Sequence, residues 1–559
     1  MCGVILRIGN GVIPSFNSIA HRGPNQQYEF HSENSILRFA RLSITGIQDG
    51  QVPVISHNLQ WSVYLNGEIY NFKNLIERFA LPFSNSDTRV IAEGIAKYGI
   101  EFLKELRGMY ALVCINLVTN EFYIARDPLG EKPLYFAHTK SSLVFSSEIR
   151  SLMEILDKKT VNPISLASYF RFGYIEEPFT IFEQIHPFPK GTCMKVSNND
   201  LTLRSIFSIT GYDENDLKIS LNELLTLVVK EGVSSEVASG LALSDGVDSS
   251  LLLSMLIRNN ETKALVVDFP EFSENSEAGQ ALRFAQQQKA PSNKIEIRMR
   301  DLKLDFIDFL KSYDQPHADL AGYSYYRIFQ AAKDLNLKVV HLGHGPDEFF
   351  WGYDWLYKPL NGVGKVAGLS LVRSDKLEFW DTPARSKWID HLLPELRMEY
   401  RPYSLSTSDK YINSRSPLQH LRSRIVHSYL SHNAFQQSDR LSMKFGIEAR
   451  SLWSDTRLYG WSQINSNNIK RDFNKNQFRK EASIMLNQEK AMKQKSGFAS
   501  PVMKTLMQSK EIESLFDESY NYIKDFFVKD LRNLESQAPT EKYRLLILAQ
   551  WLSHFGVNP

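Results

Sequence analysis

Cysteine is scarce in this sequence: Cys2, Cys114 and Cys193 are the three among 559 residues. An odd number of widely separated cysteines argues against a disulfide framework, and a reducing compartment is then the default. Long apolar runs are also missing, because no stretch reaches the roughly 18 residues that could span a bilayer. The short apolar start carries no basic region, so we expect neither a signal peptide nor a membrane anchor. These absences predict a cytoplasmic protein.

The sequence also lacks an excess of either positive or negative charge. The 65 basic and 63 acidic residues give a formal net charge of +2, without a block of like charges. This pattern argues against a nucleic-acid partner, and small molecules are the expected partners. The 43% of hydrophobic and 12% of aromatic residues are typical of a folded globular chain. The length suggests roughly two to four domains.

The chain changes character near residue 217. Up to about residue 200 it contains short apolar runs, such as 110–115, separated by Gly, Asn and Asp turn signals. This pattern predicts packed β-sheets. The polar segment 197–200 and the stretch 209–216 are the best candidates for a boundary, so we expect domains over residues 2–205 and 217–559.

Beyond residue 217, apolar strands alternate with helical stretches. The expected strands cover residues 239–243, 263–269, 294–299 and 338–342, and the expected helices include 249–258 and 275–288. Strands that alternate with helices predict a parallel sheet in an α/β domain. From about residue 390 the pattern predicts a mainly helical C-terminal part.

The position of Cys2 suggests a nucleophile. Removal of the initiator Met1 would leave one residue with both a thiol and a free α-amine. With ordinary pKa values of about 8.5 for the thiol and about 7.7–8.0 for the amine, the amine can accept the thiol proton and return it to a leaving group. Taken alone, a cysteine at this position is better explained as a buried or incidental residue.

Four short motifs accompany Cys2. They are His21-Arg22-Gly23-Pro24, Arg41-Leu42-Ser43-Ile44, Asn66-Gly67-Glu68-Ile69-Tyr70-Asn71 and Ser86-Asp87-Thr88. Together with Met1-Cys2-Gly3 they resemble, in order and spacing, the class II glutamine amidotransferase domain of the asparagine synthetase family, as far as about residue 195. The resemblance implies an α+β N-terminal-nucleophile sandwich with αββα layers. Residues 126–130 and 132–135 also fit the family, and we assign them to maintenance of the fold.

The resemblance implies a role for each residue of a glutamine pocket. Arg41 clamps the α-carboxylate of glutamine, since a guanidinium fork suits a planar anion. Glu68 and Asp87 hold the α-ammonium group. Asn66 and the backbone N–H of Gly67 form the oxyanion hole for the attacked amide. An Asn-Gly pair also favours a hairpin turn, which is the alternative for these two residues.

A second site is predicted at residues 244–250. This Ser-Asp-Gly-Val-Asp-Ser-Ser loop follows the expected strand 239–243 and resembles the pyrophosphate loop of ATP pyrophosphatases, whose fold is of the adenine nucleotide α-hydrolase type. A strand that turns into a helix points N–H groups and the positive end of the helix dipole at a phosphate chain. The alternative is a Ser-Asp-Gly turn without a ligand. The resemblance implies ATP contacts from Leu243, Ser244, Gly246, Asp248, Ser249, Ser250, Val267 and Gly343.

A third group of motifs extends the resemblance over nearly the whole chain. Gly343-His344-Gly345-Pro346-Asp347 begins a loop that resembles the family's second phosphate and metal loop. Asp248 and Asp347 are the implied ligands of Mg²⁺, an ion that prefers oxygen. Lys495 matches the lysine that stabilises charge on the acyl-adenylate and on the departing pyrophosphate. The remaining matches are residues 438–443, 446–450 and 495–501, together with 314–316, to which no role is assigned.

Three places depart from the family pattern. Asp245 replaces the first of two adjacent glycines, and a carboxylate near polyphosphate lowers affinity unless it faces away or binds metal. His344 stands where asparagine synthetases carry Glu and β-lactam-forming relatives carry Tyr, and a histidine can act as a general base near neutral pH. Residues 450–455 read Arg-Ser-Leu-Trp-Ser-Asp where Arg-Val-Pro-Phe-Leu-Asp is usual. These changes cluster on the side of the acceptor.

The motifs together predict an ATP-dependent ligase. Glutamine is hydrolysed at Cys2, and the ammonia passes to a carboxylate that is activated as its AMP ester and shielded from water. The products are an amide, AMP, pyrophosphate and glutamate. The acceptor is L-aspartate or another carboxylate, such as a sugar uronate or a specialised metabolite, and His344 slightly favours the second. A homodimer is compatible with the sequence.

Three alternatives differ in what the two halves do. An enzyme that forms an intramolecular amide without ammonia would be expected to lose its glutaminase pocket, whereas this chain keeps Cys2, Arg41, Asn66 and Asp87. A glutaminase-competent regulatory or scaffold protein with a degenerate synthetase half is suggested by Asp245. A tRNA-modifying pyrophosphate-loop enzyme would need a basic surface or an added RNA-binding module, and neither is evident.

Overall fold

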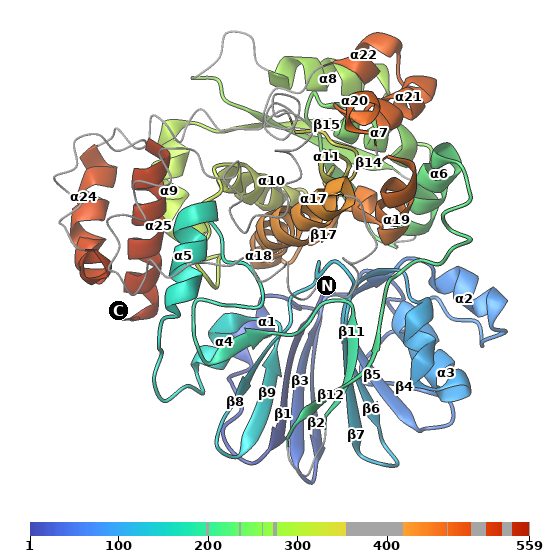
Figure 1. Cartoon of the computed structure of the whole chain (residues 1–559), viewed down its shortest axis with the longest axis vertical. Helices are drawn as coiled ribbons and strands as arrows, with labels where there is room; N and C mark the ends of the chain where they lie inside the picture. Colours follow the sequence, from blue (N-terminus) through green and yellow to red (C-terminus); the bar gives the residue numbers. More distant parts are fainter. Residues whose placement is uncertain are drawn as a thin grey trace.

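The structure is a computed structural model. It describes residues 1–196, 201–233, 236–259, 261–271, 277–353, 417–466, 468–493, 510–527 and 539–557. Within these residues the chain forms a strand-rich half and a helix-rich half, and the amino terminus lies where the two meet (Figure 1). A residue at the amino terminus can therefore contact both halves.

The first half is built on two six-stranded antiparallel sheets. One sheet has the order β10-β8-β9-β1-β3-β2 and the other has the order β12-β11-β7-β6-β5-β4. The strands are β1 (Gly3–Gly9), β2 (Gln26–Ser32), β3 (Ser35–Arg41), β4 (Val54–Ile55), β5 (Trp61–Ile69), β6 (Gly108–Asn116), β7 (Glu121–Arg126), β8 (Tyr135–His138), β9 (Ser142–Ser146), β10 (Ile185–Pro187), β11 (Thr192–Val196) and β12 (Leu203–Ser208). The apolar run 110–115 lies in β6, as the sequence predicted.

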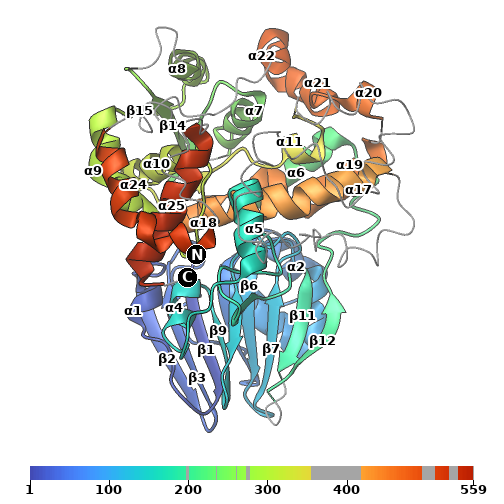
Figure 2. The ribbon, with the colours of Figure 1, turned by 60° about the vertical axis from the view of Figure 1, so that its left-hand side comes forward.

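The two sheets pack face to face through side chains such as Leu6, Phe39 and Val113. Helices α2 (Phe72–Arg78) and α3 (Asp87–Tyr98) pack against the second sheet. Helices α1 (Asn17–Ala20) and α4 (Ile149–Met153) pack against the first sheet. These are the αββα layers that the sequence predicted. Helix α5 (Pro163–Phe172) extends from the sandwich toward the second half, as Figure 2 shows.

The second half contains a five-stranded parallel sheet with the order β15-β14-β13-β16-β17. Its strands are β13 (Ser239–Ala242), β14 (Thr262–Asp268), β15 (Ser292–Glu296), β16 (Val339–His341) and β17 (Glu448–Arg450). The helices α6 (Leu221–Gly232), α7 (Val247–Leu256) and α8 (Glu277–Gln287) share one apolar core with Ala264 and Val266, while Leu265 packs with α10 (Gly322–Asp334) and α18 (Gln436–Lys444). Because successive residues of a strand point to opposite faces, helices cover both sides of this sheet. The parallel α/β sheet is therefore confirmed.

The order of the strands reverses at the centre of this sheet. Strand β14 lies on one side of β13, and β16 lies on its other side. Ligands of open α/β sheets bind at such a reversal, outside the carboxyl ends of the strands. The loops that follow β13 and β16 are the two loops that the sequence singled out for phosphate and metal.

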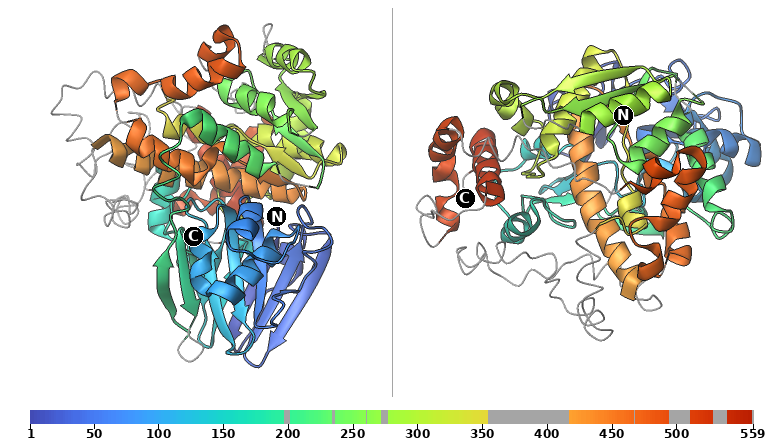
Figure 3. Two further views of the ribbon diagram at one scale, coloured as in Figure 1. Left: turned by 90° about the vertical axis from the view of Figure 1, so that its right-hand side faces the viewer. Right: turned by 90° about the horizontal axis from the view of Figure 1, so that it is seen from above.

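The rest of the second half is mainly helical, as expected. The consecutive helices α17 (Pro417–Ile425), η3 (Val426–Phe435) and α18 lie across the top of the sandwich, as the orange helices of Figure 3 show. The remaining helices are η1 (Ile100–Glu105), α9 (Met299–Leu310), α11 (Pro346–Phe349), η4 (Leu452–Ser454), α19 (Thr456–Asn465), α20 (Ile469–Asp472), α21 (Asn476–Met485), α22 (Gln488–Met492), α24 (Lys510–Ser519), η5 (Tyr520–Tyr522), η6 (Lys524–Phe526) and α25 (Pro539–Phe555). Over the described ranges, none of the helices has the length and apolar character needed to cross a membrane.

Candidate active sites

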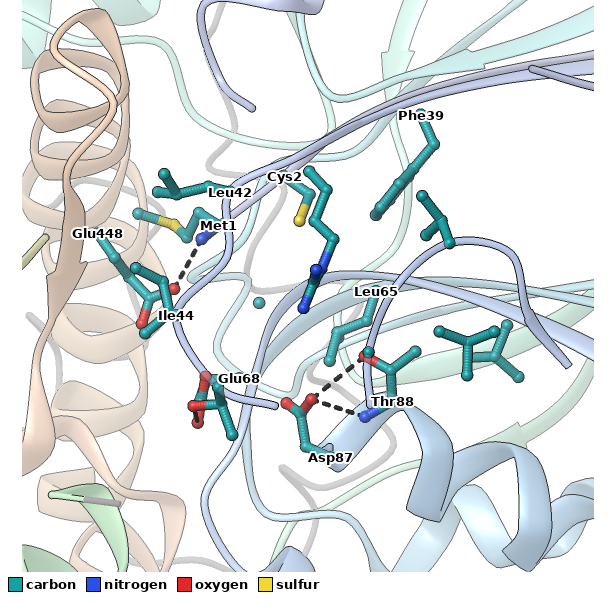
Figure 4. Close-up of a pocket in the computed structure, with 17 residues that line it drawn as sticks. Met1, Cys2, Phe39, Leu42, Ile44, Leu65, Glu68, Asp87, Thr88 and Glu448 are labelled. Atoms are coloured by element: carbon teal, nitrogen blue, oxygen red, sulfur yellow. Dashed lines mark hydrogen bonds and ion pairs between the residues drawn. The ribbon is translucent and has the colours of Figure 1, made fainter. Parts of the chain in front are cut away.

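The first candidate site is a pocket around Cys2 at the junction of the two halves (Figure 4). Cys2 directly precedes β1, and its neighbours in the pocket come from β3, β5 and the start of α3. The residues predicted for glutamine that line the pocket are Cys2, Arg41, Gly67, Glu68 and Asp87. The fold thus brings together groups that are up to 85 positions apart in the sequence. Burial raises the pKa of the Cys2 thiol, so the thiol needs a nearby base to ionise.

Asn66 lies beside Cys2 with one half of its amide group engaged. Its Oδ1 accepts a hydrogen bond of 3.0 Å from the backbone N–H of Cys2. Its Nδ2 is buried and has no hydrogen-bond partner. A buried donor without an acceptor is costly, and such a donor beside a nucleophile is suited to an oxygen that gains negative charge.

Asn66 and Gly67 do not form a hairpin turn. Both lie inside β5 and pair with Ala111 and Tyr110 of β6. The φ angle of Gly67 is +149°, and a Cβ atom there would lie 1.9 Å from the carbonyl oxygen of Met109. The glycine is therefore required by its backbone conformation and by the close approach of β6.

Substitution of Gly67→Ala tests this requirement. We expect a loss of about 3 kcal/mol or more of unfolding free energy, because a strained φ angle costs about 1–3 kcal/mol and the clash displaces β6 as well. Chemical denaturation of the full-length chain measures the change. Gly99→Ala is the matched control, because Gly99 has a φ of +76° and open space around its Cβ position. Equal losses in the two variants would contradict the role of the clash.

Arg41 holds a loop over the pocket. Its Nη2 and Nη1 donate hydrogen bonds of 2.9 and 3.3 Å to the carbonyl oxygens of Gly46 and Ile47. The same loop contacts the second half, because the N–H of Gly46 donates to Glu236 at 3.2 Å. The guanidinium therefore lies at the pocket wall, next to a loop that both halves support.

The two acidic residues of the pocket are buried and differ in their partners. Glu68 accepts a hydrogen bond of 2.6 Å from the hydroxyl of Thr45 and forms an ion pair of 3.1 Å with Arg450. Burial raises the pKa of Glu68 to about 8 despite these partners. Asp87 accepts hydrogen bonds from the N–H groups of Ile69 and Thr88 at 3.0 and 2.6 Å, and burial raises its pKa too. A ligand ammonium group between the two carboxylates would stabilise their charged forms.

A residue of the second half, Glu448, completes the pocket. Its Oε2 pairs with the amino group of Met1 at 2.8 Å (Figure 4). Its Oε1 accepts a hydrogen bond from Arg450 at 2.6 Å. Burial alone would raise the pKa of Glu448, but the N-terminal ammonium and the Arg450 guanidinium outweigh burial and lower it to about 2. The sequence pointed to the segment 446–450 but assigned Glu448 no role, since only the fold brings β17 to the amino terminus.

The second candidate site is the loop between β13 and α7. Ser249 Oγ accepts a hydrogen bond of 3.1 Å from the N–H of Ser244, and the N–H of Gly246 donates to Ser244 Oγ at 3.2 Å. Gly246 is the N-cap of α7, so the positive end of that helix faces the loop. Ser250 follows on α7, Leu243 follows β13, and Val267 lies on the neighbouring β14. A Cβ atom at Gly343 would lie 3.3 Å from the backbone nitrogen of Ser249. The loop after β16 therefore closely approaches the loop between β13 and α7.

Asp245 is accommodated by two lysines. Its carboxylate pairs with Lys490 at 2.5 Å and with Lys493, which lie in and just after α22. Its backbone does not adopt a positive φ angle. The aspartate therefore fits the loop without strain, and its charge is balanced before a phosphate arrives.

The two aspartates predicted for Mg²⁺ share one lysine. Lys475 Nζ lies 2.9 and 2.6 Å from the two carboxylate oxygens of Asp248 and 2.8 Å from Oδ1 of Asp347. The carboxylates are therefore close enough to hold one cation between them. In the described part of the chain no group of three His, Cys, Asp or Glu side chains could bind a metal. Mg²⁺ commonly uses one or two carboxylates together with substrate phosphates, so this pair fits the ion when polyphosphate is present.

The remaining predicted residues are His344 and Lys495. His344 lies in the loop that follows β16, and the same loop leads to Asp347 at the start of α11. Lys495 lies outside the described residues, as does the rest of its motif. Sequence reasoning assigned no role to Lys475, Lys490, Lys493, Glu448 and Arg450. For the three lysines, the available signal was the predicted aspartates that they contact.

The chain joins an αββα sandwich that carries the Cys2 pocket to a parallel α/β sheet whose loops are of the kind that bind phosphates. Residues 1–207 match the glutamine amidotransferase domain, and residues 220–552 match asparagine synthase. The chain belongs to the asparagine synthase family. It is a glutamine-dependent amidotransferase and ligase of the asparagine synthetase type, and use of ATP is expected for this family.

Several bacterial and archaeal proteins are similar to this chain. Asparagine synthetase (glutamine-hydrolyzing) 1 of Bacillus subtilis (strain 168) is 27% identical over 485 residues, which cover 79% of this chain and 76% of the relative. Asparagine synthetase B (glutamine-hydrolyzing) of Escherichia coli (strain K12) is 25% identical over 473 residues, 78% of each chain. A putative asparagine synthetase (glutamine-hydrolyzing) 2 of Methanocaldococcus jannaschii is 25% identical over 63% of this chain and 76% of the relative.

Proposed function

We propose that the protein hydrolyses glutamine at Cys2 and transfers the ammonia to an adenylated carboxylate. The observation that carries this proposal is the shared pocket: Glu448 of the parallel-sheet half lines the same pocket as Cys2 and contacts the amino group of Met1, the residue that precedes Cys2. A glutaminase pocket built partly by the other domain is suited to release ammonia for use in that domain. The products are an amide, glutamate, AMP and pyrophosphate.

In the first half-reaction the Cys2 thiolate attacks the amide carbon of glutamine. After Met1 is removed, the Cys2 amine accepts the thiol proton and later gives it to the departing ammonia. The unpartnered Nδ2 of Asn66 and the N–H of Gly67 stabilise the oxyanion. Arg41 binds the α-carboxylate, while Glu68 and Asp87 bind the α-ammonium group. Water then releases glutamate from the thioester.

In the second half-reaction the acceptor carboxylate attacks the α-phosphorus of ATP and pyrophosphate leaves. Leu243 and Val267 border the nucleotide, and Ser244, Gly246, Ser249, Ser250 and Gly343 surround its phosphates. Asp248 and Asp347 would hold Mg²⁺, and the ion would supply positive charge for the departing pyrophosphate. Lys475 already lies between these aspartates and supplies a fixed positive charge. Lys495 is proposed to act on the same charge, and His344 to take a proton from the attacking ammonia.

The acceptor is L-aspartate or another carboxylate such as a sugar uronate. Aspartate is supported by the names of the similar proteins, which are asparagine synthetases. Another acid is supported by His344, because an imidazole presents a different charge to the acceptor than the carboxylate of those enzymes. The scaffold alternative is not favoured, because Asp245 is paired with Lys490 and Lys493 and does not block the loop.

A screen for pyrophosphate release tests the proposal. The full-length protein is incubated with ATP, Mg²⁺, glutamine and one carboxylic acid at a time, with aspartate and uronates among the acids. We expect one class of acid to raise pyrophosphate release at least about tenfold over the sample without acid, because the acid is the acceptor whose carboxylate displaces pyrophosphate from ATP. If no acid raised pyrophosphate release while glutamate was still formed, the result would contradict the ligase. It would support a glutaminase with an inactive second half.

A further inference from the structure

His344 is held by hydroxyl groups from two other segments. The Oη of Tyr325, on α10, lies 2.9 Å from His344 Nε2, and the Oγ of Ser451, directly after β17, lies 3.3 Å from His344 Nδ1. Ser454, in η4, donates a hydrogen bond of 3.1 Å to the backbone carbonyl of His344. The side chain and the backbone of His344 are thus both fixed by neighbours.

The two serines belong to the segment that departs from the family pattern. Ser451 and Ser454 stand where Val and Leu are usual, and both are buried. Neither Val nor Leu could donate or accept at these positions. A valine at 451 would leave the Nδ1 side of the ring without this partner. Two departures more than 100 positions apart in the chain, at 344 and at 451–454, therefore meet as one hydrogen-bonded group.

The geometry favours one tautomer of the imidazole. A neutral histidine has one N–H donor and one nitrogen acceptor. A phenol is a more acidic donor than an aliphatic hydroxyl, and the phenol of Tyr325 makes the shorter of the two contacts. The consistent arrangement has Tyr325 donating to Nε2 and Nδ1–H donating to Ser451. Tyr325 and His344 are half-buried, whereas the two serines are buried.

We propose that Ser451 and Ser454 are positioning residues that hold His344 with Nδ1 protonated, and that Tyr325 is a catalytic residue that relays a proton from the reacting nitrogen to Nε2 of His344. This inference rests on the proposed function. When ammonia attacks the acyl-adenylate, the C–N bond forms and the C–O bond to AMP breaks. Tyr325 takes one proton from the nitrogen and passes its own proton to Nε2. The amide leaves neutral, and the imidazole releases the proton to water after turnover.

The tautomer can be observed without any substrate. The full-length protein is labelled with ¹⁵N-histidine, and a long-range ¹H–¹⁵N spectrum distinguishes protonated from unprotonated ring nitrogens. The variant H344Q identifies the His344 signals. We expect Nδ1 to be protonated in the unmodified protein and this preference to be lost in Ser451→Ala, while Ser451→Thr retains it. Ser442→Ala is the matched control, because Ser442 is also buried but donates to the carbonyl of Asp439.

A kinetic measurement tests whether these hydroxyl groups contribute to amide formation. With ammonium as the nitrogen source and the acid found by the screen, we expect Ser451→Ala to lower kcat about tenfold and Tyr325→Phe to lower it about 100-fold, within the range of general acid–base effects. The KM for ATP and the glutaminase rate should stay within about twofold, because neither site contains these hydroxyls. A protonated Nε2 in the unmodified protein would overturn the inference. An unchanged tautomer in both Ser451→Ala and Tyr325→Phe would overturn it as well. Failure of every acid in the screen would instead contradict the proposed function, and the spectrum would still decide the positions of the protons.

Discussion

Replacement of Cys2 by alanine is expected to abolish glutamine-supported amide formation and leave ammonium-supported formation intact. Loss of a covalent nucleophile commonly lowers a rate by about 10³-fold or more. The ammonium reaction survives because Asp248, Asp347 and Lys475 lie in the other half of the chain. Glutamate release and pyrophosphate release, measured with each nitrogen source, report on the two halves separately.

Cys114→Ala is the control for this variant. Cys114 is a buried thiol on β6 of the same half, and it does not line the pocket. We expect Cys114→Ala to keep both activities, although its stability falls by about 1 kcal/mol from the lost packing. If Cys2→Ala kept its glutamine-supported turnover and added ammonium had no effect, Cys2 would not be the nucleophile.

Replacement of Lys475 by methionine is expected to have the opposite pattern. Pyrophosphate release should fall about 10²–10³-fold, the usual cost of removing one group that stabilises charge in a transition state. The change also leaves the carboxylates of Asp248 and Asp347 without their shared cation, at 2.6 to 2.9 Å from the former ammonium position. Hydrolysis of glutamine should continue, because Lys475 does not line that pocket.

Lys480→Met is the matched control, because Lys480 is exposed and lies on α21, the helix that begins directly after Lys475. It should keep both activities. Two repelling carboxylates can also destabilise the fold by about 3–5 kcal/mol, so thermal unfolding is measured for each variant. Added Mg²⁺ should recover part of any lost stability of Lys475→Met, since a divalent cation can take the place between the carboxylates. A folded Lys475→Met protein with normal pyrophosphate release would contradict the role of Lys475.

The sequence predicted the two architectures because each depends on local patterns. Short apolar runs with turn signals indicated packed sheets, and alternating strands and helices indicated the parallel sheet. The αββα arrangement of the first half was implied by the family resemblance. The dipeptide Asn66-Gly67 shows the limit of such patterns. It favours a hairpin in isolation, but β6 pairs along the whole of β5 and holds both residues inside a strand. Long-range pairing decided a conformation that the two residues alone did not.

The sequence patterns could not predict contacts between residues that lie far apart in the chain. Lys475 is 227 positions from Asp248, and Met1 is 447 positions from Glu448, so no spacing rule connects either pair. Both contacts follow from the way the helical C-terminal part folds back over the sheet and the sandwich. The acidic residues could be named from their motifs, whereas the cations that balance them could not. The domain boundaries and the role of Lys495 remain predictions.

The most direct test follows the nitrogen from glutamine to the product. The full-length protein is given ATP, Mg²⁺, the acceptor acid found by the screen and glutamine labelled with ¹⁵N in its amide group. We expect one ¹⁵N-labelled amide and one glutamate for each pyrophosphate, and no labelled product from Cys2→Ala. Glutamate formed with the label only in free ammonium, and without pyrophosphate, would show that the two halves do not carry out one reaction.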